Sequence, residues 1–243
     1  MNSLIKTNHY IFNNKTLHYS YGEMETIKKS TLSFLSDLKK NNDRDWFKKN
    51  QAVYTDAKNN FETMVQEIIN KVVGFEPIMK GLEVKSCVYR INRDIRFSND
   101  KSPYKTHFGA FIVRGGKKNG DKFAGYYIHI EPGKSIIAGG AYMPPSPWLA
   151  SIREKINQES AKFNKIINHK DFIKFFGNID GEKLKTPPRG YSSDNPSIEL
   201  LKFKSYLAVN EVPDKVVLSP DYFSHVIAVL KTMKPLNDFL NDY

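Results

Sequence analysis

The sequence predicts an α+β domain: an antiparallel β-sheet meander flanked by N-terminal, middle and C-terminal helices. Three observations predict this class. Apolar residues recur at helical spacing toward both ends, β-branched and aromatic runs alternate with turn residues between positions 84 and 142, and no repeat or low-complexity linker divides the chain. With 243 residues, 40% of them hydrophobic, the chain can bury one substantial core.

Helical patterning begins after Met24. Leu32, Leu35 and Leu38 predict a first helix. Asp43 is the expected N-cap of a second, longer helix, which Gly74 is expected to end. The predicted apolar face of this longer helix consists of Trp46, Phe47, Val53, Ala57, Phe61, Met64, Val65, Ile68 and Val72.

Four runs predict the sheet, at residues 84–91, 107–114, 123–131 and 135–143. Gly- and Asn-containing stretches between them suit hairpin turns. A third helical region starts near Ser146 as the cap and Pro147 as its first residue, with Leu149, Ile152, Ile156, Phe163 and Ile167 facing inward. One more strand is expected within residues 200–212. The last helix follows Ser219 and is expected to kink or end at Pro235.

Residues 1–23 are expected to be a dispensable and poorly ordered N-terminal extension, and residues 24–243 a single domain. The apolar residues of the extension are isolated and show no sustained period. The surface that they can bury is therefore too small to offset the conformational entropy lost when the segment becomes ordered. The alternative is a short hairpin on the edge of the sheet. Because regular patterning starts right after Met24, this residue is a candidate native initiator.

The composition favours a cytoplasmic protein with an anionic partner. The net charge is +11, which attracts nucleic acid, anionic lipid or phosphorylated small molecules, although scattered lysines give the same number. The lone Cys87 excludes an intramolecular disulfide, and no apolar run approaches the roughly 18 residues that span a bilayer. We therefore expect no membrane partner; the sequence assigns neither a cofactor nor an oligomeric state.

The densest polar stretch is residues 89–107, which we call the arginine loop. It contains Arg90, Arg93 and Arg96, three of the seven arginines in a chain with 30 lysines. Arginine offers a planar fork of donors that binds phosphate or carboxylate bidentately. We therefore predict that this loop binds an anionic group, a small molecule or nucleic acid. The predicted ligand-binding residues are Arg90, Arg93, Arg96, Lys101 and Lys105, together with Arg189 and Tyr191 from a proline-stiffened loop further along.

Two other interpretations of this loop stay open. Asp94 and Asp100 can orient the arginines for a ligand. Alternatively, Arg93–Asp94 and Arg96–Asp100 are purely structural ion pairs that hold a long loop, as in a scaffold or interaction protein. The aromatics Tyr89, Phe97 and Tyr104 also interleave with the basic residues, as a platform for single-stranded nucleic acid requires, while core packing explains them equally well.

The enzyme alternative is a hydrolase or transferase that acts on a phosphorylated substrate. Its candidate catalytic residues are Asp94, Asp100, His107, His129 and Glu131. Period-2 alternation places Gly125, Tyr127, His129 and Glu131 on one strand face, and His129 with Glu131 and an aspartate of the loop can hold a metal. No local metal, hydrolase or dinucleotide motif such as CxxC, HExxH, GxSxG or GxGxxG occurs, so no metal ligand is assigned.

Several stretches occur in an order that carries a family resemblance: "FLSDLKKNNDRDWF", "RINRDIRFSNDKSPYKTHFGAFI", "GYYIHIEPG", "GGAYMPP" and "LKTPPRGYSSDNP". Together they resemble the domain-of-unknown-function family 2461, a largely bacterial group of hypothetical proteins. Residues 93–105 are the specific part of the resemblance, which extends from residue 24 to the C-terminus. It implies a single family domain with residues 1–23 outside it. It implies no activity, and no catalytic residue is carried over from it.

Overall fold

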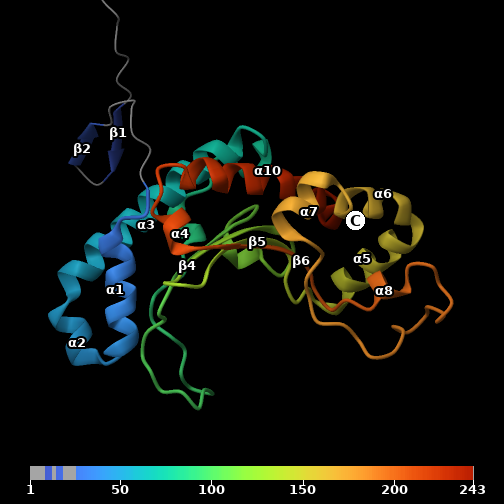
Figure 1. Ribbon diagram of the computed structural model, residues 1–243, viewed down its shortest axis with the longest axis horizontal. Helices are drawn as coiled ribbons and strands as arrows, with labels where there is room; N and C mark the ends of the chain where they lie inside the picture. The colour runs from blue at the N-terminus through green and yellow to red at the C-terminus, as the bar shows by residue number, and fades with distance from the viewer. Residues whose placement is uncertain (1–8, 13–14, 19–25, 243) are drawn as a thin grey trace, which may run out of the picture.

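The computed structural model describes residues 9–12, 15–18 and 26–242, and it confirms the α+β class (Figure 1). Its main sheet has four antiparallel strands in sequence order. These strands are β3 (Phe108–Ile112), β4 (Gly125–Ile130), β5 (Ser135–Ala141) and β6 (Tyr206–Val212). The meander predicted for residues 107–142 is therefore confirmed.

Helices precede, interrupt and follow this sheet. Before it come α1 (Lys29–Lys40), α2 (Arg44–Lys49), α3 (Gln51–Val73), the 3-10 helix η1 (Pro77–Met79) and α4 (Val84–Cys87). A second 3-10 helix, η2 (Lys117–Asn119), joins β3 to β4. Between β5 and β6 lie α5 (Ser146–Gln158), α6 (Ser160–Ile167), α7 (Lys170–Phe176) and α8 (Ile198–Leu201), and after β6 come α9 (Asp214–Val217) and α10 (Tyr222–Asn241).

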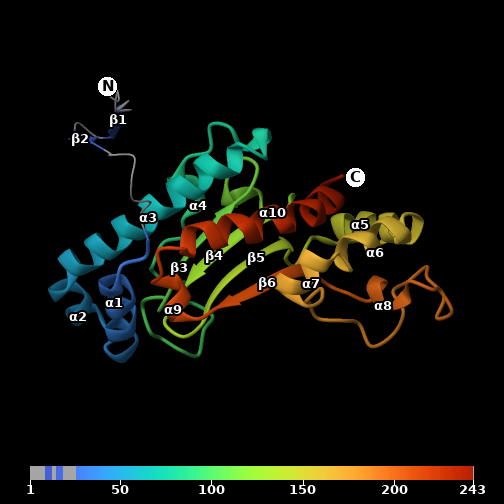
Figure 2. The same cartoon turned by 45° about the horizontal axis from the view of Figure 1, so that its top comes forward.

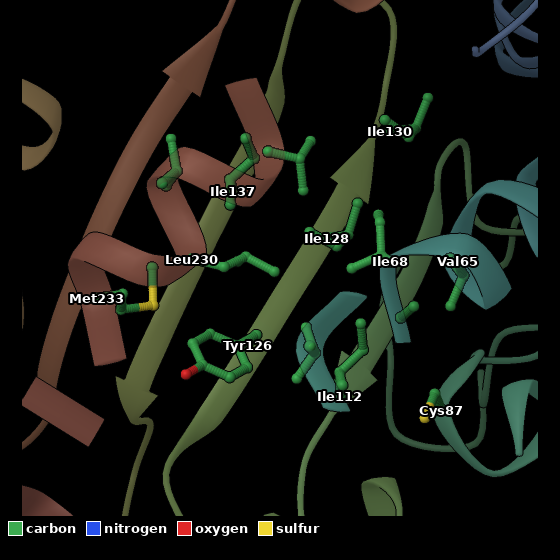
Figure 3. Close-up of a cluster of buried hydrophobic side chains, with 14 of the residues drawn as sticks. Val65, Ile68, Cys87, Ile112, Tyr126, Ile128, Ile130, Ile137, Leu230 and Met233 are labelled. Carbon is green, nitrogen blue, oxygen red and sulfur yellow. The ribbon is translucent and has the colours of Figure 1, made fainter. Parts of the chain in front are cut away.

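The core lies between one face of the sheet and the two longest helices. Helix α10 packs on β5, and α3 packs on β3 and on α10. Figure 3 shows the inward residues of β4, Tyr126, Ile128 and Ile130, beside Ile68 of α3 and Leu230 of α10. All five side chains are fully buried. Burial alternates along β4, because successive strand residues point to opposite faces.

The other face of the sheet is only partly buried. Its central row runs from Phe111 through Tyr127 and Ala138 to Val209, and three of these four side chains are partly exposed. Figures 1 and 2 show α3 and α10 on one side of the sheet, while the arginine loop extends from the other side. We call this second side the open face.

The N-terminal helices follow the predicted pattern with one break. Asp43 caps α2 as expected, because its carboxylate accepts a hydrogen bond from the amide of Trp46 (2.8 Å). The predicted long helix is divided at Asn50, whose side-chain amide donates to the carbonyl of Trp46 (2.9 Å) and so competes with helical bonding. Val53 lies in the first turn after this break and is exposed, so its predicted inward position was wrong.

The predicted strand at residues 84–91 was also wrong. Val84–Cys87 form the short helix α4, where the Ser86 hydroxyl donates to the carbonyl of Glu83 (2.6 Å) and favours a local turn over a ladder. Only from Val88 onward does this segment run beside the sheet, through an isolated bridge to Ala110.

The later helices differ from the predictions in several details. Pro145, not Ser146, is the N-cap of α5, and the single helix expected up to Ile167 is divided into α5 and α6. Helix α7 follows and was not predicted. Helix α10 continues through Pro235 to Asn241. Pro235 lies on the exposed side of α10, and buried contacts on the opposite side, such as Met233 and Leu236, hold the helix together where one backbone hydrogen bond is missing.

The N-terminal strands β1 (His9–Phe12) and β2 (Lys15–His18) pair antiparallel with His9 opposite His18. They form a two-stranded sheet of their own, so the hairpin alternative is correct for these residues but not its place on the edge of the main sheet. The remainder of residues 1–23, and with it the predicted disorder, lies outside the described residues. Within the described residues, no helix is long and apolar enough to cross a membrane.

Candidate functional site

The arginine loop leaves the sheet edge as a narrow two-stranded stem. The amide of Lys105 donates to the carbonyl of Ile91 (2.8 Å), and that of Arg93 donates to the carbonyl of Pro103 (2.9 Å). Asn92 and Tyr104 face each other as an isolated antiparallel bridge. The stem therefore gives residues 89–93 and 103–107 fixed positions beside β3.

Tyr104 anchors this stem to the N-terminal helices. Its ring stacks on Phe47 with centroids 3.9 Å apart, and Asn42 bonds both its backbone carbonyl (2.9 Å) and its backbone amide (3.1 Å). Because Tyr104 is buried, it cannot stack on a nucleic-acid base. Of the three aromatics in the proposed platform, only Tyr89 and Phe97 are exposed.

Arg93 and Arg96 are both occupied inside the loop. Arg93 pairs with the carboxylate of Asp100 and donates to the Ser102 carbonyl (3.2 Å). Arg96 holds Asp94 through two bonds, from Nε (3.0 Å) and from a terminal nitrogen (2.7 Å). The pairs expected from the sequence, Arg93–Asp94 and Arg96–Asp100, were therefore wrong. Each arginine pairs with the other aspartate, because the turn at residues 94–102 brings Asp100 back to Arg93.

The same contacts favour the charged form of both aspartates. Hydrogen bonds from Ser102 and then from Arg93 lower the pKa of Asp100 to about 2. Hydrogen bonds from Arg96 lower the pKa of Asp94. Both carboxylates lie in solvent and stay ionised at neutral pH, so neither is suited to act as a general acid.

Arg90 and Lys105 differ from the other two arginines. Within the described residues, neither is within 4 Å of a carboxylate in an ion pair. The ammonium of Lys105 donates to the backbone carbonyl of Arg90 (3.0 Å) and lies 5.3 Å from the ring centroid of Tyr89. Burial and the positive charge of Arg90 lower the pKa of Lys105. We call these two residues the cationic rim.

A histidine cluster lies on the open face next to this rim. It consists of His107, immediately before β3, and His129 and Glu131 of β4. The two imidazoles stack with centroids 4.2 Å apart, and Nε2 of His129 is 3.2 Å from Oε2 of Glu131. Each residue offers one ligand atom, and these atoms lie within 4.8 Å of one another.

The surroundings of this cluster keep its histidines neutral. Burial, the neighbouring His129 and Lys105 together lower the pKa of His107 to about 4, against the opposing effect of Glu131. Burial also lowers the pKa of His129, which Glu131 partly offsets. At neutral pH both rings therefore have a free nitrogen lone pair that can accept a proton or bind a metal.

Tyr127 completes a line of hydrogen bonds on this strand. Its hydroxyl lies 3.0 Å from Nδ1 of His129, and burial followed by Tyr89 and Glu131 raises its pKa to about 12. A protonated hydroxyl can donate to Nδ1, and His129 can then donate from Nε2 to Glu131. Glycine at position 109 leaves room for the Tyr127 hydroxyl, since a Cβ at this position would lie 2.8 Å from the hydroxyl oxygen.

The structure joins some predicted site residues and separates others. Arg90, Lys105, His107, His129 and Glu131 lie on or beside the open face. Asp94, Asp100 and Lys101 lie on the exposed outer part of the loop, where Lys101 donates to the carbonyl of Ile95 (3.2 Å). Within the described residues, neither aspartate belongs to a group of three side chains that could bind a metal ion. The third residue beside His129 and Glu131 is His107, where the sequence predicted an aspartate.

Arg189 and Tyr191 lie elsewhere. Tyr191 donates to Glu154 of α5 (3.2 Å), in the loop that precedes α8. In Figures 1 and 2 this loop lies at the opposite end of the sheet from the arginine loop. The two residues therefore do not share a site with the cationic rim.

The sequence did not single out Thr106, and it named Tyr89 only as part of a nucleic-acid platform and Tyr127 only by its strand face. Thr106 donates to Oε1 of Glu131 (3.4 Å), and the ring of Tyr89 meets that of Tyr127 edge to face at 6.4 Å. The alternation that places His129 and Glu131 on one face also predicts Tyr127 there. No sequence signal placed Tyr89 against Tyr127 or Thr106 against Glu131, because these contacts depend on how the stem and β4 pair with β3.

Away from the open face, a hollow of about 430 Å³ lies between the end of α3 and α10. Several of its polar groups bond one another: the Tyr126 hydroxyl donates to Glu76 (2.7 Å), and Lys234 bonds Asp238 (2.7 Å) and approaches Glu76 (3.6 Å). The buried Oδ1 of Asn237 has no hydrogen-bond partner among the described residues. This hollow contains no histidine or cysteine among its lining residues. The histidine cluster therefore offers the more versatile chemistry.

Comparison with known proteins identifies the family of this domain. The family described as "Conserved hypothetical protein (DUF2461)" matches residues 30–239. The chain belongs to this family. The match spans both the arginine loop and the histidine cluster, and it begins at α1, six residues later than the sequence resemblance suggested. No curated protein and no solved structure matches the chain.

Proposed function

We propose that this protein binds a phosphate- or carboxylate-bearing ligand on the open face, at the cationic rim of Arg90 and Lys105. The observation that carries the proposal is that Lys105 lies next to Arg90, and that among the described residues neither side chain has a carboxylate within 4 Å. The charge of Lys105 is partly removed from water and is repelled by that of the exposed Arg90, which is unfavourable in the absence of an anion. An anion bound between them removes this repulsion.

The surroundings of the rim support an anion with a hydrogen-bonding edge. Lys105 is partly buried, so its interaction with an anion is stronger than that of a lysine in bulk solvent. His107 and Tyr127 supply neutral donors or acceptors on the same face. Arg93 and Arg96, which the sequence placed in direct contact with the anion, instead stiffen the loop through Asp100 and Asp94.

Phosphate binding to the full chain tests this proposal. Isothermal titration with inorganic phosphate and with pyrophosphate, at low ionic strength, gives the wild-type affinity. Lys105→Met keeps the apolar stem and removes the charge. A charged hydrogen bond contributes about 1.5–3 kcal/mol, so we expect this variant to bind about 10- to 100-fold more weakly.

Lys165→Met is the matched control, because Lys165 is exposed on α6 and the substitution changes the net charge by the same amount. It should bind phosphate as the wild type does. Absence of phosphate binding by the wild type, or equal weakening by both variants, would contradict a specific anion site. Equal weakening would instead indicate attraction by the overall charge.

The nucleic-acid version of this proposal has a separate signature. Binding to duplex DNA or RNA predicts an affinity that falls with salt, with a log–log slope of about −0.9 for each neutralised phosphate. A gel-shift experiment at low salt with micromolar protein decides it. Phosphate binding without any shifted complex would assign the site to a small molecule.

A second candidate function is a hydrolase or transferase reaction on a phosphorylated substrate. The Tyr127–His129–Glu131 line favours it, since a carboxylate orients a neutral imidazole that can act as a general base. Turnover of p-nitrophenyl phosphate by the wild type, lost in His129→Asn but kept in His169→Asn, would support it. Activity that survives His129→Asn would rule out this assignment.

A further inference from the structure

We infer that His107, His129 and Glu131 form a binding site for a divalent first-row transition metal, with Tyr127 as an outer positioning residue. This inference goes beyond anion binding and does not depend on it. It starts from the identity of the three side chains. Two imidazole nitrogens and one carboxylate oxygen suit Zn²⁺, Co²⁺ or Fe²⁺, whereas Mg²⁺ and Ca²⁺ prefer sites made of oxygen atoms alone.

The spacing of the three ligand atoms fits one ion. Two donors that lie about 2.1 Å from a metal, at an angle of 90–110°, are about 3.0–3.4 Å apart. Nε2 of His129 and Oε2 of Glu131 are already 3.2 Å apart. No pair in the group exceeds 4.8 Å, so rotation of partly buried side chains can close the remaining distance.

Glu131 supplies an independent argument. Only 16% of its side chain is exposed, and within the described residues its single ion-pair partner at 4 Å or less is His129. Its other hydrogen bond, from Thr106, is long at 3.4 Å. A largely buried carboxylate with only weak neutral donors carries an uncompensated desolvation cost, which a bound cation offsets.

The outer contacts have the arrangement that metal ligands need. A metal-binding histidine usually donates its second ring N–H to a fixed acceptor, which sets its tautomer and orientation. With a metal on Nε2, the Nδ1–H of His129 can donate to the Tyr127 hydroxyl oxygen at 3.0 Å, the reverse of the direction in the metal-free tautomer described above. The second oxygen of Glu131 has only the long hydrogen bond from the Thr106 hydroxyl (3.4 Å).

The site keeps coordination positions free. Three protein ligands with an open side are typical of catalytic metal sites, whereas structural zinc sites are closed by four. The three ligands project from the open face, and Lys105 is close enough to His107 to lower its pKa. A water molecule or an anionic group of the ligand can therefore occupy the open side of the ion.

Metal titration of the full chain tests this inference. After EDTA treatment and its removal, Co²⁺ is added and its visible absorption is followed, and Zn²⁺ affinity is measured by competition with a chromophoric chelator. We expect one ion per chain. Removal of a ligand by His129→Asn or by Glu131→Gln should weaken binding more than about 100-fold, beyond the effect of an outer contact.

Tyr127→Phe distinguishes a positioning residue from a merely structural one. It should weaken metal binding about 10- to 100-fold while the metal-free melting temperature stays close to that of the wild type. His169→Asn is the matched control, because His169 is exposed at the start of α7. It should bind the ion as the wild type does.

Two results would overturn the inference. One is the absence of stoichiometric Co²⁺ and Zn²⁺ binding by the wild type, which would leave the cluster as a hydrogen-bonded network. The other is unchanged affinity in folded His129→Asn and Glu131→Gln. If one of these variants fails to fold, the other and His107→Asn decide the question. Phosphate binding without metal is measured separately, so failure of either proposal leaves the other testable.

Discussion

Acidification should destabilise the metal-free protein through His107. Its pKa is about 4 in the folded chain, against an ordinary value of 6.5, because of burial, His129 and Lys105. At pH 7.5 the ring is neutral in both the folded and the unfolded state and contributes nothing to pH dependence. As the pH falls through 6.5, the unfolded chain takes up a proton that the folded chain does not, so the free energy of unfolding decreases.

The size of this loss follows from the two pKa values. At pH 5.0 they correspond to about 2 kcal/mol of lost stability. Because the ring is only partly buried, solvent screening reduces the expected value to about 1 kcal/mol. His129, whose pKa is also lowered, adds to the loss in the same direction.

Urea unfolding in EDTA at pH 7.5 and 5.0 measures the effect. The wild type should lose about 1 kcal/mol more than His107→Gln between these two conditions. His169→Asn should retain the full wild-type loss. The reasoning is refuted if His107→Gln shows the same pH dependence as the wild type, or if NMR titration gives His107 a pKa of 6.5 or higher.

Three further substitutions test the fold by urea unfolding. Tyr126→Phe should cost about 1–3 kcal/mol, because the buried Glu76 loses its 2.7 Å hydrogen bond; a change below 0.5 kcal/mol would mean that water replaces the hydroxyl. Gly140→Ala should cost at least about 1–3 kcal/mol, since its φ is +110° and a Cβ would lie 2.0 Å from the Tyr206 carbonyl oxygen; a neutral effect would show that β5 and β6 separate easily. Asp43→Ala should cost about 1 kcal/mol through loss of the α2 cap, whereas Asp43→Asn should keep most of it; equal losses would contradict the capping role.

The predictable part of the fold is the part set by periodicity. Alternating residues of β4 and the leucine spacing of α1 have one favourable arrangement, because each places its apolar side chains against one core. The wrong predictions at residues 84–87 and at Asn50 arise because local side-chain hydrogen bonds compete with regular backbone hydrogen bonding. The hydrogen bonds of Ser86 and Asn50 change the backbone over one or two residues, which a period counted over ten residues does not detect.

The candidate site was predictable only in part for a different reason. The sequence located the arginine loop and the His129–Glu131 pair, since the residues within each of these two groups are close in sequence. It did not show which cations remain without a carboxylate. Asp94 pairs with Arg96 and Asp100 with Arg93. Only the stem that pairs residues 91–93 with 103–105 brings Lys105 beside Arg90.

The alternation along β4 separates two kinds of evolutionary constraint within one strand. Tyr126, Ile128 and Ile130 determine whether the protein folds, while Tyr127 and His129, between them, have their polar ends on the open face. In a saturation-mutagenesis library over this strand, substitutions at neighbouring positions should therefore impair different properties. Abundance in the cell should depend on the even-numbered residues, and ligand or metal affinity on the odd-numbered ones. Such a strand can acquire a new chemistry one residue at a time while the core beneath it stays unchanged.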